Sequence, residues 1–169
     1  MSEYNNDFSN NIDKIDYEQI LLSYVGKSIK PRYILGANVY PISLEINNCI
    51  APFGIDAAYG KLYMKITLPN NYIESAKYTH FFKNIDIKII NLIIEKEKGI
   101  LEPNLNKNII QTILDKNITI QDSLGNSVSV FGITKGTQIK TMQITLGDIF
   151  YVNKTQKFNY KWIVNKIIL

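Results

Sequence analysis

The chain has 169 residues, of which 46% are hydrophobic and 20% are charged, and these proportions suit one globular domain of ordinary size. They exclude an intrinsically disordered chain, and the apolar runs are far shorter than the roughly 20 residues that a membrane-spanning helix needs. A single cysteine, Cys49, and a single histidine, His80, exclude an internal disulfide and a zinc site built from these residue types.

The net charge of +4 is unevenly distributed along the chain. Residues 1–25 hold five acidic residues against one lysine, a net charge of −4, whereas residues 116–169 hold seven lysines against two aspartates, a net charge of +5. A basic second half suits a polyanionic partner. The alternative is that lysine serves only solubility, because the composition is biased toward Asn, Ile, Lys and Tyr and includes one arginine, Arg32.

The first 28 residues are expected to form an acidic N-terminal segment that is either a short helix or an extended arm. Apolar residues between Ile12 and Tyr24 recur with rough helical spacing, and Gly26 could end such a helix. From residue 29 to residue 58 the apolar runs are short and are interrupted by proline and glycine. This pattern predicts short strands and turns, with the prolines at strand ends or sheet edges.

Residues 61–68 alternate with a period of two, which predicts a strand with one buried face. The outward face would carry Lys61, Tyr63 and Lys65, and Tyr59 would extend it by two residues. Such a face is either a half-solvated strand surface or a platform on which a flat, negatively charged partner could lie.

Residues 73–95 carry apolar side chains every three or four positions, which predicts a helix whose Phe81 and Phe82 pack in the core. Residues 104–115 are expected to form a second short helix, so that a helical insertion spans 72–115. From residue 117 onward the period returns to two, which predicts a β-meander that ends in a strand with Trp162 buried and Lys161 on the opposite face. The predicted fold class is therefore α+β and β-dominant, with residues 29–169 in one domain.

The sequence contains none of the motifs that mark common catalytic or phosphate-binding sites. Asp56 and Asp86 are isolated, and their neighbours in the sequence do not suggest a paired-carboxylate site. We therefore expect a protein that is not an enzyme and that needs no cofactor and no metal ion.

Several segments, taken in order, resemble the single-stranded-DNA-binding proteins of the phage-T7 type and their relatives in large nucleocytoplasmic DNA viruses. The matching features are the turn Pro52-Phe53-Gly54, the strand that ends in Leu68-Pro69-Asn70, the helical insertion, the Asp122-to-Gly125 turn, the Lys135-Gly136-Thr137 turn, the strand 139–146 and the pattern of Phe158, Trp162 and Val164. The resemblance covers about residues 35–169. It implies an OB-like β-barrel with a long helical insertion, which binds single-stranded DNA without sequence preference.

Binding of this kind needs cations that follow the phosphates and exposed rings on which bases stack. We predict a platform formed by Tyr59, Lys61, Tyr63 and Lys65, surrounded by lysines in or beside turns and on the last strand. These predicted rim lysines are Lys135, Lys140, Lys154, Lys157 and Lys161. Phe131 and Tyr151 also lie near turns and could be exposed.

The favoured function is sequence-nonspecific binding of single-stranded DNA in viral DNA replication, repair or recombination. The expected partners are single-stranded DNA and viral replication proteins, with a homo-oligomer left open and no membrane, in the host cytoplasm (a viral factory) or in the virion. The alternative is a viral structural protein, a minor capsid or virion component that uses a related β fold for protein contacts, because fold does not decide function and tyrosine-rich surfaces also suit protein interfaces.

Overall fold

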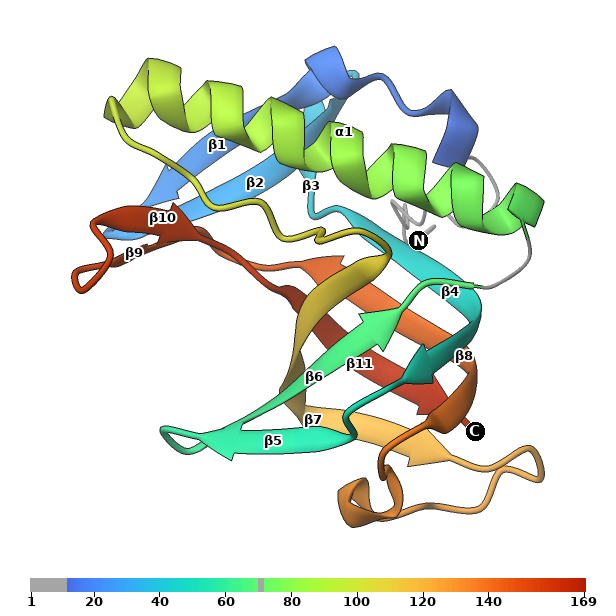
Figure 1. Cartoon of the computed structure of the whole chain (residues 1–169). Helices are drawn as coiled ribbons and strands as arrows, with labels where there is room; N and C mark the ends of the chain where they lie inside the picture. Colours follow the sequence, from blue (N-terminus) through green and yellow to red (C-terminus); the bar gives the residue numbers. More distant parts are fainter. Residues whose placement is uncertain (1–11, 70–71) are drawn as a thin grey trace.

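A computed structural model of the protein describes residues 12–69 and 72–169 (Figure 1). The described part is β-dominant and includes one α-helix, α1 (Tyr72–Glu97). Its strands are β1 (Ile20–Val25), β2 (Ser28–Leu35), β3 (Asn38–Tyr40), β4 (Ser43–Ala51), β5 (Ile55–Ala58), β6 (Lys61–Thr67), β7 (Ile109–Gln121), β8 (Thr137–Leu146), β9 (Phe150–Val152), β10 (Lys157–Asn159) and β11 (Trp162–Ile168). Three short 3-10 turns are η1 (Ile12–Lys14), η2 (Tyr17–Gln19) and η3 (Val130–Gly132).

The central sheet has six strands in the order β4-β8-β11-β7-β6-β5. Its neighbours run antiparallel except β7 and β11, which are parallel. A further pairing of β4 with β6, at Ile50 and Thr67, brings two strands that are not neighbours in this order together, so the sheet curls back on itself. Strands β1–β3 form a separate three-stranded sheet, and β9 and β10 form a hairpin.

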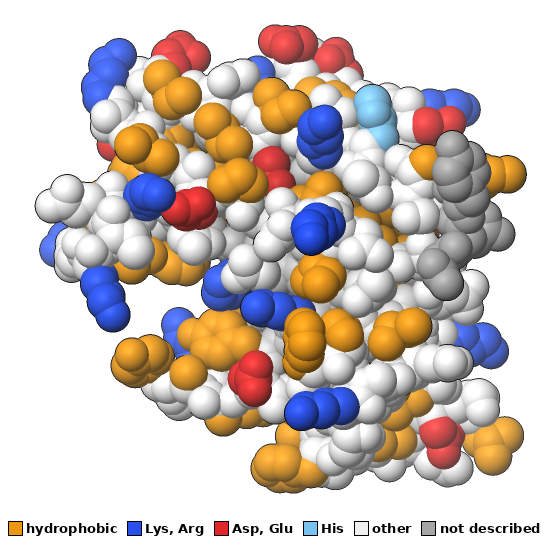
Figure 2. All heavy atoms as spheres, in the orientation of Figure 1, with side chains coloured by type: hydrophobic (Ala, Val, Ile, Leu, Met, Phe, Trp, Pro, Cys, Tyr) orange, Lys and Arg blue, Asp and Glu red, His pale blue; other side chains and the backbone are white. Residues whose placement is uncertain are grey.

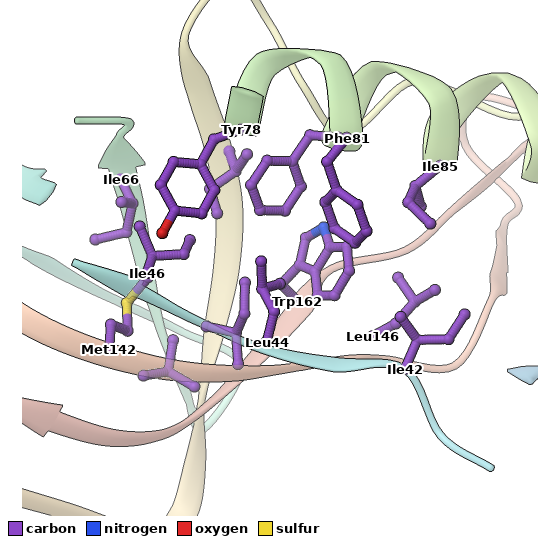
Figure 3. Packing of buried hydrophobic residues seen from close by; sticks show 14 of the residues in the cluster. Ile42, Leu44, Ile46, Ile66, Tyr78, Phe81, Ile85, Met142, Leu146 and Trp162 are labelled. Atoms are coloured by element: carbon purple, nitrogen blue, oxygen red, sulfur yellow. The ribbon is translucent and has the colours of Figure 1, made fainter. Parts of the chain in front are cut away.

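Helix α1 lies across one side of the strongly curved sheet and closes the core (Figure 1). Its buried residues include Phe81, Phe82 and Ile85, which recur at the spacing of one helix face and confirm the predicted helix. The Phe82 ring meets the ring of Trp162 edge-on, with 5.2 Å between the ring centroids. Figure 3 shows Phe81, Trp162 and Leu44 converging between the helix and the sheet. None of the helices in residues 12–69 and 72–169 is long and apolar enough to cross a membrane.

A buried carboxylate fastens α1 to the loop that follows it. Asp86 accepts hydrogen bonds from the backbone amides of Asn104 and Leu105, each at 2.9 Å, and one from the hydroxyl of Tyr160. Burial raises the pKa of Asp86, and these hydrogen bonds oppose the shift. The Asn104 side chain continues the network to the backbone of Gln111 at the start of β7. Residues that are distant in the sequence are thus held together by hydrogen bonds.

The predicted N-terminal helix is wrong for the described residues. Residues 12–19 form two single turns, η1 and η2, and residues 20–25 form β1, which pairs with β2. Gly26, with φ +60°, belongs to the turn of this hairpin and does not end a helix. The predicted domain boundary at residue 28 falls beside this turn, and the division into domains stays a prediction. The first part of the predicted acidic arm, residues 1–11, lies outside the described residues.

The predicted second helix over 104–115 is also wrong, because residues 109–121 form strand β7. Ile109, Ile110 and Thr112 are β-branched and suit a strand. Strand β7 also has a partner on each side, β6 and β11, so its backbone groups are satisfied by pairing across the sheet. Pairing with β6 and β11, which are distant in the sequence, therefore makes this segment a strand and not a helix.

The segment 157–169, predicted as one closing strand, is divided into β10 and β11. Trp162 and Val164 are fully buried, as predicted, but the register of β11 shifts between Val164 and Lys166. The shift places Ile167 in the core and keeps Lys166 out of it.

Candidate nucleic-acid interface

The strands β5, β6, β7 and β11 bring two rows of outward side chains together on the face of the sheet opposite the core. In the first row, Lys65 pairs with Gln111, and Lys161, the residue immediately before β11, contacts Gln111 from the other side. In the second row, Asp56 pairs with Tyr63, and Ile113 and Ile163 continue the row across β7 and β11. The alternation predicted for residues 61–68 is confirmed, because Met64 and Ile66 on the other face are buried.

Tyr63 and Lys161 lie at the centre of this surface. The Lys161 ammonium group is 6.0 Å from the centroid of the Tyr63 ring, within the range of a cation–π contact. Lys161 also donates a hydrogen bond of 3.1 Å to the side-chain oxygen of Gln111. Burial lowers the pKa of Lys161, and the positive charge of Lys65 lowers it further. Two cations are therefore close enough to repel each other, which favours an anion between them.

Two hollows adjoin this pair, and both Tyr63 and Lys161 line each of them. The first hollow, of about 270 Å³, also includes Asp56, Lys65 and Gln111. The second hollow, of about 280 Å³, extends over Ile113 and Ile163 to Lys61, Gly147, Asp148 and Phe150. In Figure 2 a notch separates the β5–β6 hairpin from the β9–β10 hairpin, and lysine or arginine side chains lie along its margins.

Gly147 allows the backbone after β8 to approach β11 closely. Its amide donates a hydrogen bond of 3.0 Å to the carbonyl oxygen of Lys161. A Cβ atom at this position would lie 2.5 Å from the same oxygen, so a larger residue would displace the backbone of Lys161. No local pattern in the sequence points to this glycine, because its role depends on a contact between two segments.

Tyr59 does not extend the strand face as predicted. It occupies the two-residue turn between β5 and β6 with Gly60, and both residues have positive φ, +54° and +74°. This pair of angles is typical of a type I′ hairpin turn. The Tyr59 side chain is 99% exposed at the tip of the hairpin, so it is accessible to a partner but is not stacked beside Tyr63.

The turn Pro52-Phe53-Gly54 adds a second aromatic ring to the surface. The Lys65 ammonium group is 5.8 Å from the centroid of the Phe53 ring, which is 52% exposed. Gly54 has φ +68°, and a Cβ atom there would lie 3.2 Å from the backbone nitrogen of Lys135. The fold thus brings the Lys135 turn next to the β4–β5 turn that carries Phe53.

The remaining predicted lysines are placed differently from one another. Lys154 is exposed in the turn of the β9–β10 hairpin. Lys157 forms a salt bridge of 2.7 Å with Glu102, so its charge is already partly neutralised. Asp148, which lines the second hollow, is held by Lys30 at 2.9 Å in the same way.

Lys140 lies apart from Tyr63, so the predicted rim lysines do not all surround the same surface. It lines another hollow with Asn48 and Glu74, and none of the residues there lines either hollow at Tyr63. Lys140 is exposed although it shares the sequence parity of buried Met142. The reason is a local irregularity opposite Asn48, whose φ is +59°, at which both β4 and β8 place two successive residues outward.

Other aromatic residues fall into two groups. Phe131 is 84% exposed and Tyr151 is 48% exposed, as their positions near turns predicted, and Phe150 is 44% exposed in the second hollow. Trp162, Phe81 and Phe82 are buried and cannot stack with a base. Among the residues that the structure describes, no group of three or more His, Cys, Asp or Glu side chains could hold a metal ion.

Three features of this surface were not predicted from the sequence: Gln111, Phe150 and the position of Asp56. The Pro-Phe-Gly turn was a local signal for Phe53, but no local pattern predicts that Gln111 lies between Lys65 and Lys161. That arrangement follows only from the pairing of β6, β7 and β11.

Comparisons with known proteins point to a fold. No protein-family model matches the sequence, and no curated protein matches it. Among solved structures, gp2.5 of bacteriophage T7, a single-stranded-DNA-binding protein, is 12% identical, with a TM-score of 0.50 over 76% of this chain and 86% of that chain.

Two structures of the single-stranded-DNA-binding protein of bacteriophage Enc34 are also similar. Its C-terminal truncation is 12% identical, with a TM-score of 0.48 over 89% of this chain and 92% of that chain. Its complex with single-stranded DNA is 11% identical, with a TM-score of 0.45 over 89% of this chain and 94% of that chain. At such identities, the likeness to the T7 protein shows that the two chains share a fold.

Proposed function

We propose that the protein binds single-stranded DNA without strong sequence preference through the outward face of β5, β6, β7 and β11. The observation that carries this proposal is the position of Tyr63 and Lys161, which share two adjoining hollows on a face of the sheet that α1 leaves open. The fold shared with the T7 protein supports the same conclusion.

The mechanism combines electrostatic capture with base stacking. Among the described residues, Lys61, Lys65 and Lys135 form no salt bridge, so their charges are available to phosphates. Tyr63 supplies the central ring, and Phe53 and Phe150 offer further exposed rings on either side of it. Stacking on such rings contributes about 1–3 kcal/mol per base, and each phosphate contact releases counterions.

We further propose that the curled sheet is an OB-like barrel and that the protein is a binding protein and not an enzyme. The pairing of β4 with β6 supports a barrel, because it joins two otherwise separated strands. A role in viral DNA replication, repair or recombination, in a viral factory of a large DNA virus, is the biological setting that this function and the sequence resemblance favour. Viral replication proteins and a second copy of the chain are the further partners proposed.

The test is a fluorescence-anisotropy titration of a labelled single strand of ~30 nucleotides at several salt concentrations, with unlabelled duplex as competitor. The expected result is binding that weakens steeply with salt and that duplex displaces poorly. Absence of binding at low salt would remove this function and would turn attention to the virion-component alternative.

Two variants locate the site in the same titration. Lys161→Gln removes the central cation and should weaken binding. The control, Lys83→Gln, removes a lysine that is exposed on α1 and lines neither hollow. Equal loss of affinity in the two variants would indicate a general charge effect and would contradict the proposed surface.

A further inference from the structure

The first hollow combines side chains of opposite hydrogen-bonding character. Gln111 and the two lysines, Lys65 and Lys161, provide donors, while Asp56 provides a carboxylate that can only accept. Asp56 is the cross-strand partner of Tyr63, and Gln111 is the cross-strand partner of Lys65. The donor groups and the acceptor group therefore belong to adjacent rows of the sheet, with the Tyr63 ring beside both.

The polar groups of this hollow are only partly satisfied. Lys161 donates to the Gln111 side-chain oxygen, which leaves the Gln111 amide nitrogen without a partner among the described residues. The carboxylate of Asp56 forms no hydrogen bond and no salt bridge with any side chain of residues 12–69 and 72–169, although Lys65 lines the same hollow. Both groups remain available to a ligand.

Binding of phosphates alone does not explain why a carboxylate, Asp56, lies in this hollow. A carboxylate repels phosphate oxygens, so its presence at the centre of a DNA-binding surface lowers the affinity for the backbone. The edge of an unpaired base is different, because it carries donors and acceptors side by side. A site that has an acceptor next to two kinds of donor is suited to such an edge.

Guanine matches this arrangement better than the other bases. Its N1–H and N2–H groups can donate together to one carboxylate, while its O6 and N7 atoms accept hydrogen bonds from a lysine or an amide. Thymine has one N–H between two carbonyl oxygens, so it would place an oxygen against Asp56. The volume, about 270 Å³, lies just below the roughly 300 Å³ at which pockets for drug-sized ligands begin, and therefore suits one base.

We propose that this hollow, which we call the Asp56 hollow, holds one unpaired base of a bound strand and prefers guanine. The inference rests on the single-stranded-DNA-binding function proposed above. Capture of the strand is otherwise independent of sequence, and this hollow adds a preference for one base at one position of the bound strand. The base stacks against Tyr63, donates to Asp56 and accepts from Gln111 and Lys161.

The experiment compares two labelled single strands of equal length, one of thymidines only and one in which isolated guanosines replace every fourth thymidine. Isolated guanines do not assemble into four-stranded structures, and both strands carry the same charge. The expected result is that the wild-type protein binds the guanine-containing strand at least about fivefold more tightly, the lower end of what a bidentate base contact gives. When adenosines or cytidines replace the guanosines, the gain in affinity over the all-thymidine strand should be clearly smaller.

The Asp56→Asn variant identifies the group that recognises the base. It should bind the all-thymidine strand at least as tightly as the wild type, because a repulsive charge is gone, and should lose the preference, so that the affinity ratio approaches 1. The matched control is Lys61→Gln, which alters the second hollow alone. It should weaken binding to both strands and keep the ratio.

The outcomes separate this inference from the function on which it rests. Salt-sensitive binding of both strands with equal affinity would overturn the guanine preference and leave the DNA-binding function standing. A preference that survives in Asp56→Asn, or an equal gain with adenosine or cytidine, would also overturn it. Failure to bind either strand would overturn both proposals.

Discussion

The two faces of β6, β7 and β11 differ in almost every physical respect, although their residues alternate along the same strands. On the inner face, Met64, Ile110 and Trp162 are at most 2% exposed and belong to the hydrophobic core. Figure 3 shows Trp162 beneath α1. On the outer face, Tyr63 and Lys161 are partly exposed and line two hollows. A period of two thus lets each strand hold the fold together with one set of side chains and offer a binding surface with the other.

The largest expected effect comes from emptying the inner face. Trp162→Ala removes the side chain that meets both Phe81 and Phe82 and leaves a cavity beneath α1. It should lower the free energy of unfolding by about 3–5 kcal/mol, measured by urea denaturation. Tyr63→Ala, one residue of the outer face, is the comparison and should cost much less. Similar losses in both variants would mean that the two faces do not differ as described.

A smaller loss of stability is expected when α1 is released from its loop. Asp86→Ala leaves the amides of Asn104 and Leu105 buried without an acceptor. Each unsatisfied group costs about 1–3 kcal/mol, but the variant also removes a carboxylate whose burial is unfavourable, so the net loss should be about 1–3 kcal/mol. Urea denaturation of Asp86→Asn, which keeps one acceptor oxygen, should give an intermediate value. No loss in either variant would show that the network does not hold the helix.

The same carboxylate predicts a pH dependence with a defined sign. The pKa of Asp86 is raised in the folded protein, so between its ordinary value of 3.8 and its folded value the folded state binds more protons than the unfolded state. The contribution of Asp86 to stability therefore falls as the pH rises through this window. The difference in unfolding free energy between wild type and Asp86→Asn should decrease accordingly, and a difference that increases would contradict the assignment.

On the outer face, Tyr63→Ala should weaken binding of single-stranded DNA by about 1–3 kcal/mol, the contribution of one stacked base, while far-ultraviolet circular dichroism stays unchanged. Tyr24→Ala is the matched control, since Tyr24 is half exposed on β1 and lines neither hollow. An equal loss of affinity in the control would place the site elsewhere.

The smallest expected effect is on the salt dependence. Lys65→Gln removes one cation that forms no salt bridge with the described residues, and should reduce the slope of log affinity against log salt by about 0.7 for a single strand. Lys157→Gln should change the slope less, because Lys157 is already paired with Glu102. A slope that is the same in wild type and Lys65→Gln would exclude a phosphate contact at Lys65.

Features that depend on local periodicity could be predicted from the residues alone. The alternation over 61–68 fixed which residues of β6 are buried, and the three-to-four spacing over 73–95 fixed helix α1. The same reasoning placed Trp162 in the core and Lys161 on the opposite face. In each case the side chains alone distinguish an apolar face from a polar one, because the period of the element is short.

Elements and neighbours that depend on distant partners became visible only in the folded chain. Residues 20–25 and 109–121 are strands because β2, β6 and β11 pair with them, and their own spacing did not distinguish a strand from a helix. Gln111 and Asp56 join Tyr63 through strand register, and Lys140 is set apart by an irregularity in β4 and β8. Register joins residues separated by many positions in the chain, so it is absent from any local pattern.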